Sequence, residues 1–210
     1  MDDGTVLMTR CVVGISGGTC SGKTTLARML AEHFGRDCVT FSQDWYYRDL
    51  AALTPAARAT VNFDEPAAVE APLLAAQVAA LAAGRAIEAP QYDFTLHTRR
   101  AETRHLDPAP VILVEGLHVI GMAELEGLLS LRVFVEASDA VRFARRRERD
   151  TRERGRTAAQ VTTQFEATVR PMHARHVAPL AARADVTVAG EDPLEPAAAA
   201  LAERIRKLLR

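Results

Sequence analysis

The sequence predicts an α/β protein in which helices flank a parallel sheet. Short apolar runs typical of buried strands alternate along the chain with stretches of helical period, which is the order expected of parallel strands joined by helices. Residues 111–114 are apolar without interruption, as in a strand buried on both faces. The composition, 48% hydrophobic and 25% charged, is that of a globular chain, and 210 residues fit one domain over 1–210 with a small excursion.

The amino-terminal part predicts a strand, a tight loop and a helix. Residues 11–16 are an apolar, β-rich run that ends in glycines. From about Lys23 onward, apolar residues recur at helical spacing. A second short strand is expected over 39–41, followed by an aromatic loop over 45–47.

The middle of the chain predicts a helix and a small hairpin. Residues 51–83 are rich in alanine, and a helix is best supported from Pro72 at its start to Gly84 at its end. Residues 85–106 alternate polar and apolar side chains without helical period, and Pro90 permits only an edge strand. The remaining strands are expected over 111–114, 131–135 and 186–188, and the remaining helices after Ser138, over 157–180 and at the carboxyl end.

Charge and cysteine usage restrict the partners. A net charge of −1 lacks the basic excess of proteins that bind nucleic acid non-specifically. No apolar run reaches the roughly 18 residues of a membrane span, and the acidic start at residues 1–3 lacks the basic region of a signal peptide. The three cysteines form neither a disulfide framework nor a Cys-x-x-Cys pair. We expect a cytoplasmic protein that binds neither nucleic acid nor membranes.

Lysine is almost absent from the chain, and one of the two lysines lies in a phosphate-binding motif. Residues 17–24 fit G-x-x-x-x-G-K-[ST] between a predicted strand and a predicted helix. Glycines let backbone N–H groups surround phosphate oxygens, and the helix N-terminus adds positive potential. Lys23 supplies charge to the β/γ-phosphates, and the Thr24 hydroxyl suits Mg²⁺. The expected ATP-binding residues are Gly17, Gly18, Thr19, Cys20, Ser21, Gly22, Lys23, Thr24 and Thr25.

This motif, a P-loop, occurs in several classes of protein, and the sequence narrows the choice. A GTPase would need an Asn-Lys-x-Asp motif, which is absent because the only lysines are Lys23 and Lys207. The Leu-Ser-Gly-Gly signature of transporter ATPases is absent as well. Small-molecule kinases are therefore the best-supported class.

Further motifs follow in a fixed order between about Val12 and Asp185. They are residues 14–24, 43–47 (Gln-Asp-Trp-Tyr-Tyr), 62–66 (Asn-Phe-Asp-Glu-Pro), 92–99 (Tyr-Asp-Phe-Thr-Leu-His-Thr-Arg), 115–116 (Glu-Gly), 149–156 (Arg-Asp-Thr-Arg-Glu-Arg-Gly-Arg), Gln164 and 169–172 (Val-Arg-Pro-Met). With them the chain resembles the uridine kinase (uridine-cytidine kinase) family, in the group that includes phosphoribulokinase. The resemblance implies a P-loop NTPase-type sheet, a hairpin over about 85–106 in the nucleoside site, and an arginine-rich lid over about 142–165.

Two carboxylates are candidates for the chemistry. Asp44 follows the second predicted strand, where it could accept the proton of an attacking hydroxyl or hold the metal, and the resemblance implies the general base. Glu115 ends a buried apolar run, a costly place for a carboxylate unless it meets a cation. The expected metal ligands are Thr24, Glu115 and Asp44.

Residues 142–156 hold eight arginines against three acids, and we refer to residues 142–165 as the arginine-rich segment. Such a run is ordinarily a solvated helix face, but Gly155 breaks the helix between two arginines, which suits a lid that closes on transferring phosphate. The resemblance assigns this role to Arg146, Arg149, Arg154 and Arg156. The expected catalytic residues are Asp44, Lys23, Arg149, Arg154 and Arg156.

The resemblance also implies the nucleoside site. Asp64 is expected on the ribose hydroxyls, four ring side chains around the base, and Gln164 at the pocket mouth. The expected substrate-binding residues are Asp44, Tyr47, Phe63, Asp64, Tyr92, His97, Arg146, Arg156 and Gln164. His173 and His176, which lack a ligating companion, are interpreted as solvated.

These expectations describe a kinase that uses ATP and Mg²⁺ to phosphorylate the 5′-hydroxyl of uridine or cytidine, giving UMP or CMP. Ala189-Gly190 stands where the family commonly has Pro-Arg-Gly, on the expected adenine side, so GTP stays open as donor. Two alternatives remain: a kinase of another sugar-like alcohol, similar to phosphoribulokinase, and a non-catalytic nucleotide-binding regulator. The resemblance suggests a homo-oligomer, such as a homotetramer.

Overall fold

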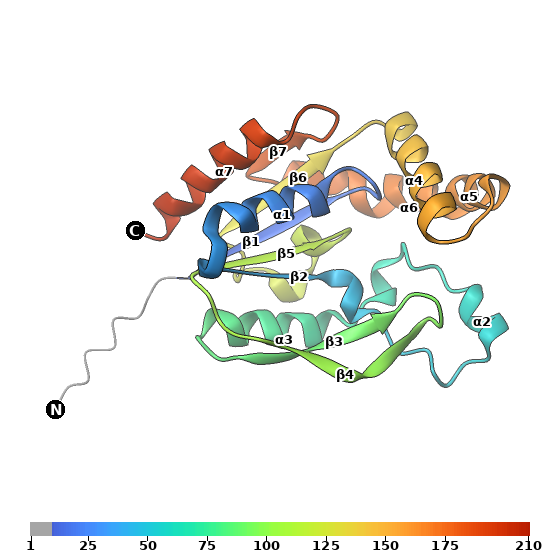
Figure 1. The fold of residues 1–210 in the computed structure, drawn as a ribbon, viewed down its shortest axis with the longest axis horizontal. Helices are drawn as coiled ribbons and strands as arrows, with labels where there is room; N and C mark the ends of the chain where they lie inside the picture. The colour runs from blue at the N-terminus through green and yellow to red at the C-terminus, as the bar shows by residue number, and fades with distance from the viewer. Residues whose placement is uncertain (1–9) are drawn as a thin grey trace.

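A five-stranded parallel sheet forms the centre of the computed structural model, which describes residues 10–210 (Figure 1). The acidic start at residues 1–3 lies outside the described residues. The strand order is β2-β5-β1-β6-β7, and every neighbouring pair is parallel, as predicted. The strands are β1 (Cys11–Gly17), β2 (Cys38–Ser42), β5 (Val111–Gly116), β6 (Leu131–Glu136) and β7 (Val186–Ala189).

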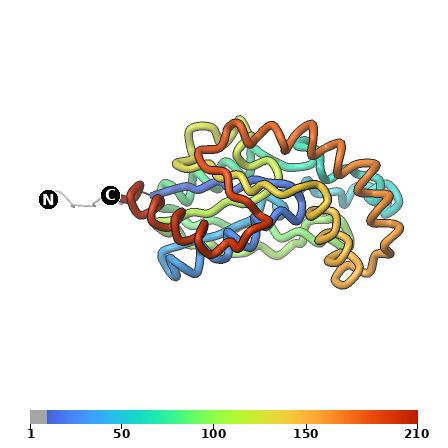
Figure 2. The backbone as a smooth tube through the Cα atoms, turned by 90° about the horizontal axis from the view of Figure 1, so that it is seen from above, coloured from blue at the N-terminus to red at the C-terminus, as the bar shows by residue number. Residues whose placement is uncertain are grey.

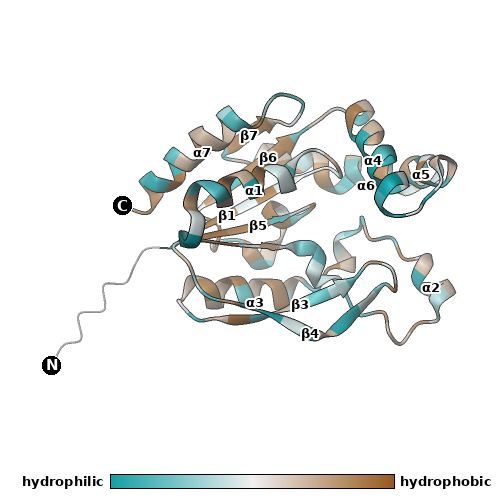
Figure 3. Ribbon diagram, in the orientation of Figure 1, coloured by the Kyte–Doolittle hydropathy of each residue, from teal (hydrophilic) through white to brown (hydrophobic). Residues whose placement is uncertain are grey.

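Helices cover both faces of this sheet, so that its central strands β1, β5 and β6 are largely buried (Figure 3). Helices α1 (Lys23–Phe34) and α7 (Glu195–Leu208) pack on one face, where Val13 and Ile15 are completely buried. Helix α3 (Ala71–Ala82) packs on the other face. No helix among residues 10–210 is both long and apolar enough to cross a membrane.

The chain leaves the sheet after β2 and returns at β5, and the predicted hairpin lies within this excursion. It comprises β3 (Ile87–Asp93) and β4 (Thr98–Leu106), which pair antiparallel as a separate two-stranded sheet. Pro90 is part of β3, and the register shifts between Pro90 and Tyr92. The excursion also contains α2 (Pro55–Ala59) and α3. The small hairpin is thus confirmed, with proline at an edge as expected.

The arginine-rich segment lies at the end of the molecule away from the carboxyl terminus (Figure 2). Helix α4 (Asp139–Glu153) begins at Ser138, whose side chain accepts from the Val141 N–H, and α5 (Ala158–Gln164) begins at Thr157 with a capping box. The single helix predicted over 157–180 is interrupted by π-helical turns at Phe165–Val169 and His173–Val177 around α6 (Arg170–Met172). Pro171 has no N–H to donate, which breaks the regular ladder there.

Candidate active site

The phosphate-binding loop joins β1 to α1 at the carboxyl edge of the sheet. Gly22 caps α1 with φ at +109°, a conformation that favours glycine. At Gly17 a Cβ atom would lie 2.4 Å from the Val135 carbonyl oxygen, so only glycine fits. The Ser21 N–H donates to the Gly18 carbonyl at 3.1 Å. The structure thereby places the expected ATP-binding residues 17–25 in one loop and the first turn of a helix.

Three charged side chains meet beside this loop. The sheet register sets Glu115 of β5 beside Ser42 of β2, and Asp44 lies two residues after Ser42 in a 3₁₀ turn that Ser42 caps. The Thr24 hydroxyl donates to Glu115 Oε2 at 3.3 Å. Burial raises the pKa of Glu115, the charge of Lys23 opposes this shift, and the charge of Asp44 adds to it.

This group of side chains fits a magnesium ion that is shared with bound phosphates. Mg²⁺ prefers oxygen ligands and is commonly held by one or two carboxylates together with phosphate oxygens and water. The Thr24 hydroxyl and the carboxylates of Glu115 and Asp44 provide such oxygens. Residues 10–210 contain no cluster of three His, Cys, Asp or Glu that could hold a metal alone. A metal held here by two carboxylates and a hydroxyl has coordination positions left for phosphate oxygens and water.

An aromatic pocket lies on the other side of Asp44. The Tyr47 ring meets Phe63 at 5.1 Å and Tyr92 at 5.5 Å between centroids, both edge to face. His97 stacks on Phe63 at 4.9 Å with an interplanar angle of 21°. His97 has a φ of +54°, which is uncommon outside glycine and marks a constrained turn between β3 and β4. The four predicted ring side chains are thus brought together.

Polar groups in this pocket have unusual environments. Burial, followed by the charges of Asp44 and Asp64, raises the pKa of Tyr47 well above its usual value. Burial raises the pKa of Tyr92 to about 12, and its hydroxyl is buried without a hydrogen-bond partner. Burial also raises the pKa of Asp64, against the charge of Arg146. Tyr47 and Tyr92 therefore remain neutral donors.

His97 and the arginine-rich segment are close enough to interact. Burial lowers the pKa of His97, and the positive charge of Arg156 lowers it further. The imidazole is therefore neutral at pH 7. Arg156 in turn donates from Nη1 to Gln164 Oε1 at 2.5 Å. The predicted residue Gln164 is thus held by arginines, since Arg146 also donates to the same oxygen, at 3.1 Å.

The predicted arginines surround a residue that sequence reasoning missed. Arg149 donates to Asp150 Oδ1 from Nε at 2.9 Å and from Nη2 at 2.7 Å. Arg146, Arg154 and Arg156 lie 3.5, 3.6 and 3.5 Å from the same carboxylate. No sequence pattern distinguished Asp150 from the other acids of this helix. Its complete burial is visible only in the folded chain.

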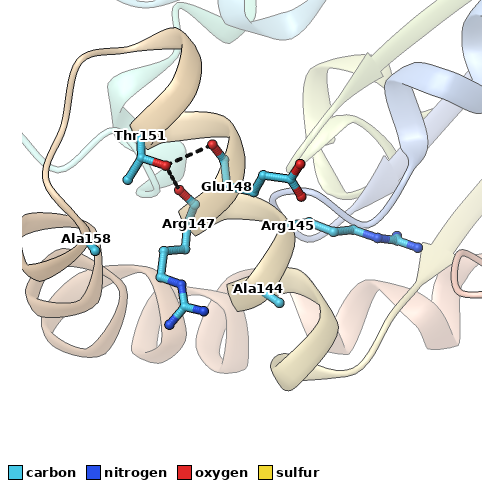
Figure 4. A pocket seen from close by; sticks show the side chains of 6 residues that line it. All are labelled: Ala144, Arg145, Arg147, Glu148, Thr151 and Ala158. Atoms are coloured by element: carbon cyan, nitrogen blue, oxygen red, sulfur yellow. Dashed lines mark hydrogen bonds between the residues drawn. The ribbon is translucent and has the colours of Figure 1, made fainter.

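The opposite face of α4 carries different residues. It lines a surface hollow of about 480 Å³ in which Thr151 donates to the carbonyls of Arg147 and Glu148 (Figure 4). Arg145 points away toward the phosphate-binding loop and donates to the Gly190 carbonyl at 2.8 Å. Only part of the arginine run is therefore solvated.

Two histidines complete the surroundings of the site. His118, which the sequence did not single out, is 3% exposed, and its Nε2 lies 3.1 Å from the Asp64 carbonyl oxygen. The prediction that His173 is solvated is wrong. Its Nδ1 is buried without a partner, and burial, with the nearby charge of Arg142, lowers its pKa to about 4. This ring packs close to Gly18 of the phosphate-binding loop.

Comparisons with known proteins agree with this geometry. A uridine kinase of Lactobacillus johnsonii is 40% identical over 200 residues, covering 94% of this chain and 95% of the relative. A uridine kinase of Deinococcus deserti is 43% identical over 196 residues, covering 93% and 95%. Phosphoribulokinase from Rhodobacter spheroides has a similar fold, with a TM-score of 0.64 at 16% identity over 89% of this chain and 74% of that chain.

The family comparison covers the same elements that build the site. The sequence profile described as "Phosphoribulokinase / Uridine kinase family" matches residues 12–191. This span runs from β1 and the phosphate-binding loop, through the aromatic pocket and the arginine-rich segment, to the end of β7. With this match and the extensive identity to two uridine kinases, the chain belongs to the phosphoribulokinase/uridine kinase family.

Proposed function

We propose that this protein transfers the γ-phosphoryl group of ATP to the 5′-hydroxyl of uridine or cytidine, giving UMP or CMP. The position of Asp44 is the observation that carries the proposal. Its negative charge contributes to raising the pKa of Glu115 beside the phosphate-binding loop. It also contributes to raising the pKa values of Tyr47 and Asp64 in the aromatic pocket. A carboxylate between a phosphate site and an aromatic pocket is placed to connect a nucleotide donor with a nucleoside acceptor.

The phosphate side of the site would stabilise the charge that moves during transfer. Mg²⁺, when bound, neutralises phosphate oxygens. The Thr24 hydroxyl and Glu115 would hold it, and Lys23 would place its ammonium on the β/γ-phosphates. Asp44 would accept the proton of the 5′-hydroxyl as the oxygen attacks, and the arginines would bind the transferring group.

The acceptor side would bind a flat base and a ribose. Tyr47, Phe63, Tyr92 and His97 would surround the pyrimidine, and the unpartnered Tyr92 hydroxyl would donate to it. Asp64 would accept from the ribose hydroxyls. Gln164 and Arg156 would close the site from the arginine-rich segment.

The two alternatives need fewer of these features. A kinase of another sugar-like alcohol has no need of the aromatic pocket, and a non-catalytic regulator has no need of Asp44 or the converging arginines. The uridine kinase names of the relatives also favour a nucleoside acceptor. GTP remains a second candidate donor, because the loop at Ala189-Gly190 departs from the common family pattern.

A phosphorylation screen tests the proposal directly. Purified protein is incubated with Mg²⁺ and ATP, or GTP, and with single members of a panel of nucleosides and sugar phosphates. We expect UMP and CMP as products, and none when Mg²⁺ is chelated. Phosphorylation of a sugar phosphate but of no nucleoside would establish the first alternative. The single domain over 1–210, the homo-oligomer and the cytoplasmic location stay predictions.

A further inference from the structure

A single carboxylate lies at the centre of the arginine-rich segment. Asp150 is completely buried, in a helix whose sequence is dominated by charged residues. An ionised side chain in such a position requires compensating charge. Four guanidinium groups provide it at distances of 2.7 to 3.6 Å. They belong to Arg146, Arg149, Arg154 and Arg156.

The backbone carbonyl of Asp150 also contacts two of these four arginines. Its carbonyl oxygen accepts from the Arg154 N–H at 3.3 Å and from the Arg156 N–H at 3.1 Å. Gly155, between these two arginines, has a φ of +62°, and nothing lies within 4 Å of where its Cβ would be. The contacts with Asp150 therefore help to hold Arg154 and Arg156 near the end of α4, together with the Arg156–Gln164 hydrogen bond.

The two glutamates nearest to Asp150 in the helix behave differently. The side chains of Glu148 and Glu153 are 74% and 51% exposed, and both pair with Arg152. Exposed ion pairs of this kind contribute little to stability. Asp150, in contrast, contacts Arg146, which donates to Thr19 Oγ1 of the phosphate-binding loop at 3.1 Å.

The charge balance gives this arrangement a function. Four arginines facing one another without an anion would repel and separate, whereas one carboxylate holds them together and leaves three positive charges in excess. A phosphoryl group in transfer carries negative charge that such preorganised donors stabilise.

From these contacts we infer that Asp150 is a positioning residue, which holds Arg146, Arg149, Arg154 and Arg156 in the arrangement that receives the transferring phosphoryl group. The inference rests on the proposed function, and it adds a residue that acts on the reaction only through others. Arg149 is its main intermediary, because it makes the two shortest contacts.

The test compares Asp150→Asn, which keeps the shape and removes the charge, with Glu148→Gln as matched control on the same helix. We expect Asp150→Asn to lower kcat by about 10- to 100-fold, the cost of misplacing preorganised groups, and to change the KM for uridine by less than about threefold. Glu148→Gln should stay within about twofold of the parent in both constants. An unchanged kcat in Asp150→Asn overturns the inference.

A double-mutant cycle separates positioning from a general loss of structure. If Asp150 acts through Arg149, then Asp150→Asn adds little to the loss caused by Arg149→Ala, whereas independent effects multiply. Multiplying losses overturn the inference. Should Asp150→Asn fail to fold, Asp150→Glu keeps the charge but moves the carboxylate outward by one methylene. We expect the Asp150→Glu variant to fold and to have a lower kcat than the parent. Full activity of this variant overturns the inference.

A measurement made without any nucleoside tests this inference separately from the proposed function. Hydrogen exchange over residues 146–156 is followed with and without ATP. ATP should protect this span in the parent and in Glu148→Gln, but not in Asp150→Asn. Equal protection in all three overturns the role of Asp150 even if uridine is phosphorylated. A failure to phosphorylate any nucleoside contradicts the proposed function but leaves this readout intact.

Discussion

The Thr24 hydroxyl lies 3.3 Å from Glu115 Oε2, although 91 residues separate the two along the chain. The contact joins the first turn of α1 to the carboxyl end of β5. It is possible because β1, which leads into α1, pairs in parallel with β5. Two side-chain oxygens from distant segments therefore meet at the edge of the sheet.

The first prediction concerns the metal. Glu115→Gln removes the carboxylate charge there, and we expect the Mg²⁺ concentration for half-maximal activity to rise about tenfold or more. Because burial raises the pKa of Glu115, protons compete with the metal, and the parent should need more Mg²⁺ as the pH falls. Magnesium titrations at several pH values check this. Glu136→Gln, which changes an exposed acid at the end of β6, is the control. If Glu115→Gln and this control gave the same titration curve, the assignment of Glu115 to the metal would be contradicted.

The second prediction separates proton transfer from binding at Asp44. Asp44→Asn should lower kcat by roughly 10² to 10⁴, the usual contribution of general acid–base catalysis, and leave ATP affinity nearly unchanged. Single-turnover kinetics and calorimetric ATP binding measure the two effects. Asp37→Asn, on the exposed turn before β2, serves as control. If ATP affinity collapses together with kcat, Asp44 is mainly a metal ligand.

The third prediction concerns base recognition. Tyr92→Phe removes a buried hydroxyl that has no partner within the protein, and His97→Ala removes the ring stacked on Phe63. Each change should raise the KM for uridine about tenfold, the cost of one lost hydrogen bond or stacking contact, with a much smaller effect on the KM for ATP. Steady-state kinetics with each substrate varied will show the difference. Equal increases in both constants would indicate a folding defect instead.

The fourth prediction is a loss of stability in acid. Burial lowers the pKa values of His118 and His173 to about 4, whereas these groups titrate near 6.5 in the unfolded chain. As the pH falls from about 6.5 to 4, the unfolded state binds protons that the folded state does not, so folding stability decreases by up to about 1.4 kcal/mol per pH unit for each histidine.

Urea unfolding at pH 7, 6 and 5 measures this effect. His118→Gln should weaken the pH dependence, because glutamine cannot take up a proton. His33→Gln, at an exposed histidine of α1, should leave it unchanged. A pH dependence in His118→Gln as steep as in the parent would show that other groups cause the acid sensitivity.

The fifth prediction concerns Cys20, a half-buried thiol in the phosphate-binding loop, beside the N-terminus of α1. Burial raises the pKa of Cys38 to about 12 and also raises the pKa of Cys11, so both remain unreactive thiols near neutral pH. Iodoacetamide should therefore inactivate the protein through Cys20, and ATP should protect it. Cys20→Ala should resist inactivation, and Cys38→Ala should remain sensitive. Inactivation of Cys20→Ala at the parent rate would place the sensitive group elsewhere.

The strands and the phosphate-binding loop could be predicted because local sequence determines them. An apolar run such as residues 111–114 can bury all of its side chains only inside a covered sheet. Gly22 is needed because the backbone has a positive φ at this position. The aromatic pocket could be proposed only through the resemblance, since its rings come from separate segments. Nothing local indicates that Tyr47 and Tyr92 meet.

The buried polar groups could not be predicted, because tertiary contacts create them. Asp150 follows an arginine in a charged helix, a pattern typical of a solvated surface, yet its side chain is buried among arginines of the helix and of the turn after it. His118 is buried because the segment that contains Asp64 covers it. The π-helical turns near Pro171 likewise escaped a prediction based on apolar periodicity.

The excursion between β2 and β5 has a consequence for how this enzyme can change. Residues 43–110 leave the sheet at one strand and return at its immediate neighbour, and they include Tyr47, Phe63, Asp64, Tyr92 and His97. The phosphate-binding loop and the arginine-rich segment lie outside this stretch. The rings proposed to surround the base, together with Asp64, thus lie in one contiguous cassette whose two ends are on neighbouring strands. Exchange of this cassette between relatives, with Asp44 kept at its start, offers a route to new alcohol acceptors beside the same phosphate-binding loop and arginine-rich segment.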